Sequence, residues 1–250
     1  MQGGQGPHRG ESVFARWLWG GTLVLTTILL AFSPALPQTR EPVPDEAAAQ
    51  LITAALFQYF DPSSVFQVTV FGASIAGDSL RLETVHIDGR PAVLHGFRAG
   101  LLAHLTDVEL DAAGMAAQQV RVRRVRKATI VLEATARDVE AGLTGLSPRL
   151  LHPKVVLGDG QFEIAATVVR GQKLYPAVAR GRLRIEGGQR VIVLVTRATV
   201  SGDDVPPHLV ESELAKLNPV VDLSRWPLGL RIQRAVLSRG KVEFLLTAGE

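Results

Sequence analysis

The chain has 250 residues, of which 46% are hydrophobic and 20% are charged, and this balance supplies enough apolar side chains for a sizeable core and excludes disorder along the whole chain. The formal net charge is only +3, whereas a dedicated nucleic-acid-binding protein is usually more basic, so we expect no nucleic-acid partner. The chain has no cysteine, which excludes disulfide bonds and thiolate chemistry.

The first predicted element is a transmembrane anchor or signal segment at residues 17–37. The run WLWGGTLVLTTILLAFSPAL, from Trp17 to Leu36, has no charged residue, and a helix of this length spans a hydrocarbon core of about 30 Å. Arginines precede the run and mainly acidic residues follow it, so the positive-inside rule places the tail at residues 1–16 in the cytoplasm. We therefore expect a single-pass protein of the cell membrane with an extracytoplasmic C-terminal domain.

The same segment also has features of a cleavable signal peptide. Ser33-Pro34-Ala35 has small residues at the positions that a signal peptidase inspects. Cleavage there would make the protein secreted. The length of the apolar run, together with Pro34 and Pro37, favours an uncleaved anchor.

A short linker at residues 38–45 and a helix at residues 46–60 come next. The linker holds two prolines among polar residues, a composition typical of a stiff spacer. Pro44-Asp45 favours a helix start and Asp61-Pro62 favours a stop. Helical spacing places one apolar stripe on this helix, formed by Leu51, Ala55, Leu56, Tyr59 and Phe60.

Beyond Pro62 the apolar residues alternate with polar ones, and this period predicts β-strands. Strands are expected at residues 66–70, 80–82, 85–87, 100–102, 105–110, 120–133, 154–157, 161–170, 177–186, 190–200, 228–237 and 241–247. Hairpin turns are expected at Asp88-Gly89, Gly158-Asp159-Gly160, Gly187-Gly188 and Arg239-Gly240. Most of the sheet should therefore be antiparallel.

Two further short helices interrupt the predicted strands. One carries apolar residues at helical spacing after Asp138, which suits an N-cap, and the other lies between Pro206 and Pro219. The predicted fold class is α+β, with a long curved, mostly antiparallel β-sheet that wraps the N-terminal amphipathic helix. Two short helices and the N-terminal transmembrane helix complete it, and the extracytoplasmic domain covers residues 46–250.

So few helices leave the concave face of a large sheet short of apolar cover. A curved sheet of this kind could leave a cavity for an acyl chain. The alternative is that the sheet folds on itself and has no cavity, and the residues alone leave both readings open.

No catalytic residue, cofactor or metal site is predicted. His86, His95 and His104 lie nine residues apart, a spacing that matches no zinc signature. Gly72-Ala73-Ser74-Ile75-Ala76 approaches the nucleophile-elbow pattern of hydrolases, but its last Gly is replaced by Ala and no helix is expected after Ser74. A loop between two strands is the favoured interpretation.

A basic stretch opens the strand expected at residues 120–133. Its cations are Arg121, Arg123, Arg124, Arg126 and Lys127. The alternation of arginine with valine changes phase near Arg123-Arg124, which predicts a β-bulge there. No aromatic residue lies between residues 118 and 140, whereas a nucleic-acid groove carries stacking aromatics among its cations. Two interpretations stay open: a solvated strand face, or a contact with anionic lipid headgroups.

The C-terminal run LNPVVDLSRWPLGLRIQRAVLSRGKVEFLLTAGE resembles the end of the LmeA-like phospholipid-binding family of bacteria. The stretches Trp226-Pro227-Leu228-Gly229-Leu230 and Arg239-Gly240-Lys241-Val242 take the places of the family's Pro-containing segment and Gly turn. Residues 128–143, ATIVLEATARDVEAGL, are similar to its central strand and short helix, and residues 68–72, VTVFG, to its early strand. The likeness extends over residues 46–248, with Trp226 where the family commonly has Leu.

The resemblance implies a non-catalytic envelope protein that binds phospholipid, with a fold similar to tubular lipid-binding (TULIP-like) domains. Under this hypothesis the stripe from Leu51 to Phe60 and the curved sheet hold acyl chains, and residues 121–127 face anionic headgroups. Phospholipid or a membrane surface is then the partner. The alternative is an envelope structural or assembly protein that binds another protein and has no lipid cavity, and a hydrolase based on Ser74 is a third hypothesis.

Overall fold

The computed structural model describes residues 40–94, 97–111, 121–146, 149–215, 218–224 and 227–249. Residues 40–250 form one compact unit. The expected cytoplasmic tail, the anchor or signal segment at residues 17–37 and the first residues of the linker lie outside the described residues. No helix within the described ranges is long and apolar enough to cross a membrane.

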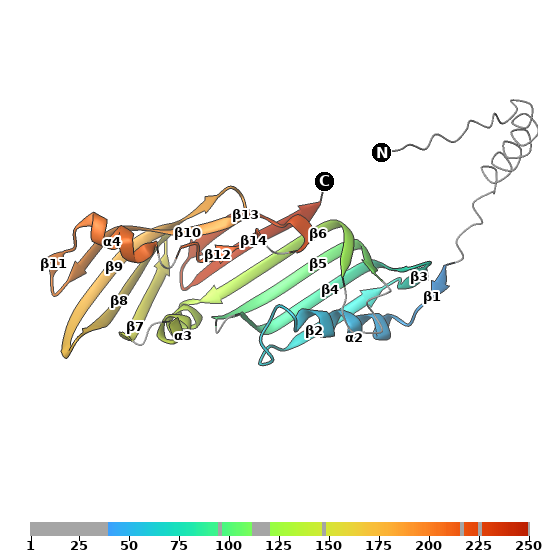
Figure 1. Cartoon of the computed structure of the whole chain (residues 1–250), viewed down its shortest axis with the longest axis horizontal. Helices are drawn as coiled ribbons and strands as arrows, with labels where there is room; N and C mark the ends of the chain where they lie inside the picture. Colours follow the sequence, from blue (N-terminus) through green and yellow to red (C-terminus); the bar gives the residue numbers. More distant parts are fainter. Residues whose placement is uncertain are drawn as a thin grey trace, which may run out of the picture. The chain divides into compact units, whose positions relative to one another are not determined.

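The unit is built mainly from antiparallel strands in two sheets (Figure 1). The eight-stranded sheet has the order β1-β3-β4-β5-β6-β14-β13, and β2 also pairs with β4. Its strands are β1 (Glu41–Pro42), β2 (Phe66–Phe71), β3 (Ser74–Ala76), β4 (Ser79–Leu94), β5 (Phe97–Asp111), β6 (Val122–Thr135), β13 (Arg231–Ser238) and β14 (Lys241–Gly249). The C-terminal hairpin therefore returns to complete this sheet beside β6.

The six-stranded sheet has the order β11-β10-β9-β8-β7, and β12 also pairs with β10. Its strands are β7 (Leu150–Gly158), β8 (Gln161–Arg170), β9 (Lys173–Glu186), β10 (Arg190–Val200), β11 (Asp203–Asp204) and β12 (Val221–Asp222). An α+β fold dominated by antiparallel strands is confirmed, but the expected single long sheet is wrong. Since β6 pairs with β14 and not with β7, the strands that follow β6 start a second sheet.

Three α-helices and one 3-10 turn accompany the sheets in the described part of the chain. They are α2 (Asp45–Leu56), α3 (Ala136–Leu146), α4 (Pro207–Leu214) and η3 (Pro227–Gly229). The three expected helices in this region are therefore present, with shorter bounds for the first and last. The helix α2 ends at Leu56, and the turns that follow it bring Phe60 into the core.

The start of α3 differs from the expected N-cap at Asp138. The helix begins at Ala136, directly after Thr135. The Thr135 N–H donates a hydrogen bond to the Asp138 carboxylate (2.9 Å), and the Asp138 N–H donates one to Thr135 Oγ1 (3.2 Å). This reciprocal arrangement is a capping box, in which Thr135 is the N-cap and Asp138 lies in the first turn.

Three of the four expected hairpin turns are confirmed, at residues 158–160, 187–188 and 239–240. The turn expected at Asp88-Gly89 is wrong, because both residues lie inside β4 and Gly89 pairs with Phe66 of β2. A Cβ atom at Gly89 would lie 2.8 Å from Cε1 of the Phe66 ring. Gly89 therefore makes room for an aromatic side chain and does not reverse the chain.

The bulge expected near Arg123-Arg124 is confirmed. Glu109 of β5 pairs with Arg124, whereas Leu110 pairs with Val122, so Arg123 is the extra residue of β6. The phase change in the sequence therefore marks a real shift in the pairing of the two strands.

Backbone hydrogen bonds join the two sheets along β13. The N–H of Gly160, in the β7–β8 turn, donates to the carbonyl oxygen of Leu237 (3.1 Å), and the N–H of Gly240 donates to that of Leu157 (2.9 Å). The Ile232 N–H donates to the carbonyl oxygen of Gly188, in the β9–β10 turn (2.7 Å). The turns of the six-stranded sheet thus abut the edge of the eight-stranded one.

The apolar core consists of two clusters. The larger packs α2, through the buried Ala48 and Ile52, against the eight-stranded sheet. The smaller joins β7 and β8 to the β13–β14 hairpin, around residues such as Leu237. Partly buried Leu183 and Phe244 pack against both clusters, so the two parts of the core are contiguous.

Candidate functional site

The apolar stripe of α2 packs into the protein core. Leu51, Ala55 and Leu56 are partly buried against the larger cluster, and Phe60 belongs to it with 6% of its surface exposed. Tyr59 lies in the turn after the helix and is 44% exposed. Most of the residues expected to touch lipid therefore contact other side chains of the protein, and little of the stripe is open.

The basic stretch lies at the start of β6, and all of its cations are exposed. Arg123 nevertheless forms a two-point pair with Asp78, with Nη1–Oδ1 and Nη2–Oδ2 distances of 2.9 and 2.8 Å. The hydrogen bond from Arg123 is the main cause that holds the pKa of Asp78 below its usual value. Arg126 pairs with Asp107 at 3.1 Å.

Three cations of the basic stretch have no ion pair within the described ranges, namely Arg121, Arg124 and Lys127. Carboxylates lie close to them, since Glu109 is the strand partner of Arg124 and Asp111 is 3.2 Å from Arg123. These carboxylates lower the net positive charge of the stretch and so weaken its attraction for anions.

The six-stranded sheet has one apolar face, which we call the inner face. The register places its residues side by side across four strands: Val155 and Leu157 of β7, Phe162, Ile164, Ala166 and Val168 of β8, Ala177, Ala179, Leu183 and Ile185 of β9, and Val191, Val193, Val195, Ala198 and Val200 of β10. The opposite face is mixed: it carries charged side chains such as Glu163 and Arg180 and also apolar ones such as Val169 and Leu174. The inner face differs from it in being almost entirely apolar, which is typical of a face that is covered by something.

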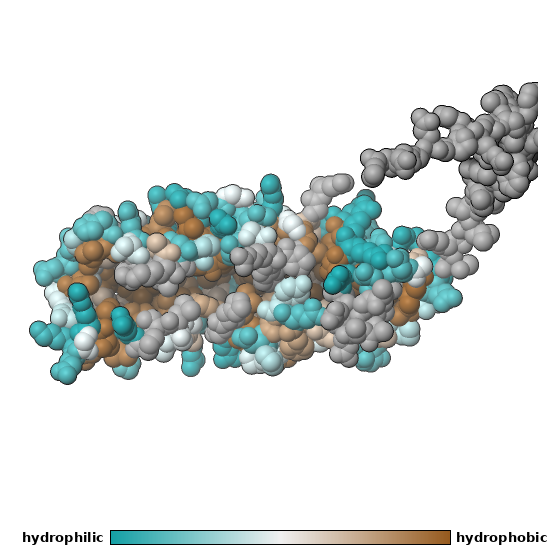
Figure 2. Space-filling view, in the orientation of Figure 1, coloured by the Kyte–Doolittle hydropathy of each residue, from teal (hydrophilic) through white to brown (hydrophobic). Residues whose placement is uncertain are grey.

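Among the described residues, protein covers only part of the inner face. Near β13 the buried Val155, Leu157 and Phe162 belong to the smaller core cluster, and side chains of α3 pack against it. Farther from β13, six residues are partly exposed and belong to neither cluster: Ala166, Val168, Ala177, Ala179, Ala198 and Val200. Figure 2 shows hydrophobic side chains in a hollow between hydrophilic margins over this sheet.

A pocket of about 340 Å³ adjoins the inner face between β10 and α4. It shares Val193, Val195 and Ala198 with the inner face, and Val210 of α4 adds a further apolar side chain. Across the pocket, the Asn218 side chain accepts a hydrogen bond from the Val193 N–H (2.9 Å) and donates one to the Val193 carbonyl oxygen (3.0 Å). The Asn218 side chain thus takes the place of a neighbouring strand for the N–H and carbonyl groups of Val193.

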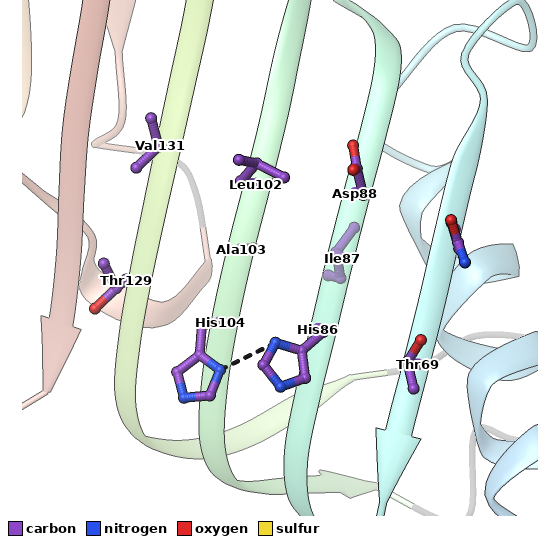
Figure 3. Close-up of a pocket in the computed structure, with 10 residues that line it drawn as sticks. Thr69, His86, Ile87, Asp88, Leu102, Ala103, His104, Thr129 and Val131 are labelled. Atoms are coloured by element: carbon purple, nitrogen blue, oxygen red, sulfur yellow. Dashed lines mark hydrogen bonds between the residues drawn. The ribbon is translucent and has the colours of Figure 1, made fainter.

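A second, open depression of about 310 Å³ lies on the face of the eight-stranded sheet that points away from the core (Figure 3). His86 and His104 are strand partners there, and their Nδ1 atoms are 3.2 Å apart. One of these nitrogens donates a hydrogen bond that the other accepts. No group of three side chains suited to a metal ion occurs in the part of the chain that the structure describes, and His95 lies outside that part.

Ser74 does not lie on a strand-to-helix turn. It begins β3 and pairs with Arg81 of β4, and the chain continues as a strand to Ala76. The loop expected at residues 72–76 is therefore confined to Gly72-Ala73, and residues 74–76 form a short strand instead.

Sequence reasoning missed the inner face and the histidine pair for the same reason. Both depend on which residues of different strands lie opposite each other, and the register is not visible in the spacing along one strand. The alternation in residues 161–170 and 177–186 was the available signal, since it marks one apolar face on each strand. Comparisons of the chain with family models, with curated proteins and with solved structures each find no match.

Proposed function

We propose that the protein binds phospholipid at the bacterial cell envelope without catalysis, with acyl chains lying on the inner face of the six-stranded sheet. The observation that carries this proposal is the part of that face where six partly exposed apolar residues from β8, β9 and β10 belong to neither core cluster of the described residues. Soluble domains rarely leave a continuous apolar surface open unless something binds there. The resemblance to the LmeA-like family supports the same function.

An acyl chain fits this surface better than a compact polar ligand. The side chains are alanine and valine, which offer no hydrogen-bond partner, and the face extends along the strands of the sheet. Transfer of a methylene group from water to such a surface contributes roughly 0.8 kcal/mol. A flexible hydrocarbon can therefore gain binding energy along the whole face.

The basic stretch begins β6, and the six-stranded sheet follows the far end of that strand, so we propose Arg121, Arg124 and Lys127 as contacts for anionic headgroups of the membrane surface and not for the lipid on the inner face. They are exposed and have no ion pair in the described part of the chain, whereas Arg123 is held by Asp78. The membrane anchor at residues 17–37 belongs to the same proposal.

The test uses the full chain and a phospholipid that carries a photoreactive diazirine in its acyl chain. After irradiation, labelled peptides are mapped by mass spectrometry. We expect labelling in β8, β9 and β10, at residues 162–200. Labelling confined to segments outside the six-stranded sheet would overturn the proposal.

Adjacent alanines of β8 supply a matched pair of variants. Ala166 lies on the inner face and Ala165 on the opposite face, and both are partly buried. Ala166→Trp should remove most of the labelling of the sheet because its indole occupies the inner face, whereas Ala165→Trp should retain it. Circular dichroism of both variants verifies that they fold, and equal labelling of the two would contradict the assigned face.

A further inference from the structure

Three cations cluster at the end of the six-stranded sheet that lies away from β13. Arg170 and Lys173 are strand partners that flank the β8–β9 turn. Arg149 is adjacent, because its carbonyl oxygen accepts a hydrogen bond from the Val169 N–H (2.9 Å). All three cations are exposed, and we call Arg149, Arg170 and Lys173 the cationic tip.

Carboxylates are scarce around the cationic tip. The sequence has no Asp or Glu from residue 141 to residue 158, or from residue 164 to residue 185. None of the three cations has an ion pair among the residues that the structure describes. Asp203 and Asp204 lie at the same end of the sheet but in β11, beyond β10, and Asp204 pairs with Arg197. The tip therefore keeps its positive charge, unlike the basic stretch of β6.

The cationic tip also continues directly into the inner face. Arg170 follows Val168 on the same face of β8, and Tyr175, the partner of Val168, lies beside it. On the opposite face of the same hairpin, Leu174 follows Lys173 and is 63% exposed. An exposed leucine beside unpaired cations combines the two features that bind an anionic bilayer, which are charge attraction and an apolar side chain that can enter the interface.

The geometry points to the cationic tip as a docking site for the surface of an anionic lipid bilayer, which places the open end of the inner face against the membrane. This inference rests on the proposed lipid-binding function. It adds the place at which lipid would pass between the bilayer and the inner face. A bilayer is favoured over a soluble anion because the site is a convex hairpin end that joins the apolar face. Binding should weaken with added salt, since exposed charges are screened.

The experiment uses the absence of cysteine from the natural chain. Leu174→Cys supplies a single thiol for an environment-sensitive fluorophore, and the full chain is placed in nanodiscs of phosphatidylcholine. It is then mixed with separate vesicles that carry brominated acyl chains, made of phosphatidylcholine alone or of phosphatidylcholine with phosphatidylglycerol. We expect quenching by the anionic vesicles, little by the neutral ones, and less of it at high salt.

Two triple variants remove equal charge from different places. Arg149→Gln with Arg170→Gln and Lys173→Gln should weaken the apparent affinity for anionic vesicles roughly 100-fold, at about fivefold for each cation. Arg98→Gln with Arg231→Gln and Arg239→Gln, three exposed cations on the eight-stranded sheet or its β13–β14 turn that have no part in the proposed lipid site, should leave the quenching at position 174 unchanged. A fluorophore at Val156→Cys, whose native side chain is as exposed at 64% but lies at the other end of β7, should not be quenched.

Equal effects of the two triple variants, or equal quenching at positions 156 and 174, would overturn the docking site. Its failure is distinguishable from failure of the proposed function. If the diazirine lipid still labels the inner face while the fluorophore at position 174 is never quenched, lipid binding stands and docking by the tip is wrong. If neither signal is found, both are wrong.

Discussion

At the scale of single residues, Arg123 shows that a run of cations in the sequence is not one uniform surface. Arg123 is the bulged residue, and its side chain pairs with Asp78, just before β4, and with Asp111, at the end of β5. The guanidinium also donates a hydrogen bond to Ser79 Oγ (2.9 Å). Arg123 therefore serves the fold, whereas Arg121 and Arg124 have no ion pair among the described residues.

Replacement of Asp78 by Asn should lower the free energy of unfolding near neutral pH and have little effect in acid. The pKa of Asp78 is lowered, chiefly by the hydrogen bond from Arg123. A carboxylate whose pKa is lowered by folding stabilises the folded state at every pH above its pKa in the unfolded chain, which is about 4. This stabilisation is lost as the pH falls through the pKa of the folded state. Because Asp78 is largely exposed, the effect is small.

Urea unfolding of the wild type and the Asp78→Asn variant, from neutral pH to below about pH 3, measures this difference. Asp203→Asn removes an exposed carboxylate for which no ion pair occurs in the described ranges, and it should change stability little at any pH. A deficit of Asp78→Asn that persisted in acid would show that the substitution acts by some route other than the ion pair.

At the scale of elements, local patterns predicted the strands well and their partners poorly. Alternating residues located β8, β9 and β10, and paired glycines located the turns between them. The glycine of Asp88-Gly89 carried the same turn signal but serves the packing of Phe66. A turn and a close approach both need glycine, and the sequence alone cannot separate the two causes.

The candidate site was less predictable than the strands that build it. The stripe from Leu51 to Phe60 had the correct apolar character, but it was assigned to lipid and mostly contacts the core. The inner face and the cationic tip need the register of three hairpins, which brings Arg149 next to Arg170. Such contacts between distant residues are set by tertiary packing, which periodicity does not encode.

At Gly181 the strands pack so closely that there is no room for a Cβ atom. Gly181 lies on the inner face opposite Phe162, whose ring crosses it. A Cβ atom at Gly181 would overlap the backbone carbonyl oxygen of Leu194 and would lie 2.5 Å from Cζ of Phe162. We expect Gly181→Ala to destabilise the protein by about 1–3 kcal/mol, because the carbonyl oxygen belongs to the sheet and cannot easily move.

Gly100→Ala is the matched control for Gly181→Ala. Gly100 is also a strand residue, and the nearest atom to a Cβ there is the Glu133 carbonyl oxygen at 3.7 Å. Thermal unfolding should therefore show a lower melting temperature for Gly181→Ala and little change for Gly100→Ala. Similar losses in both variants would mean that strand glycines are needed for their flexibility rather than for space.

At the scale of the whole molecule, the two sheets share one continuous interior in residues 40–249. The turns of the six-stranded sheet bond to β13, and Leu183 and Phe244 contact both core clusters. The part of the inner face near this junction is closed by protein, and the residues beyond it belong to neither core cluster of the described ranges. A stable sheet with an open apolar end is then possible because the junction supplies the stability.

A substitution at Leu237 tests whether the six-stranded sheet depends on the junction for its stability. Leu237 lies in the smaller cluster with 7% of its surface exposed, and its carbonyl oxygen accepts the hydrogen bond from the Gly160 N–H. Leu237→Ala should destabilise the protein by about 2–4 kcal/mol through the cavity that it leaves.

If the junction stabilises both sheets, hydrogen exchange measured by mass spectrometry should speed up in peptides of β8–β9 and also in those of β13–β14. The exposed Val156→Ala should alter neither. Faster exchange confined to β13–β14 would instead mean that the six-stranded sheet holds its structure independently, and that its open face does not rely on the junction.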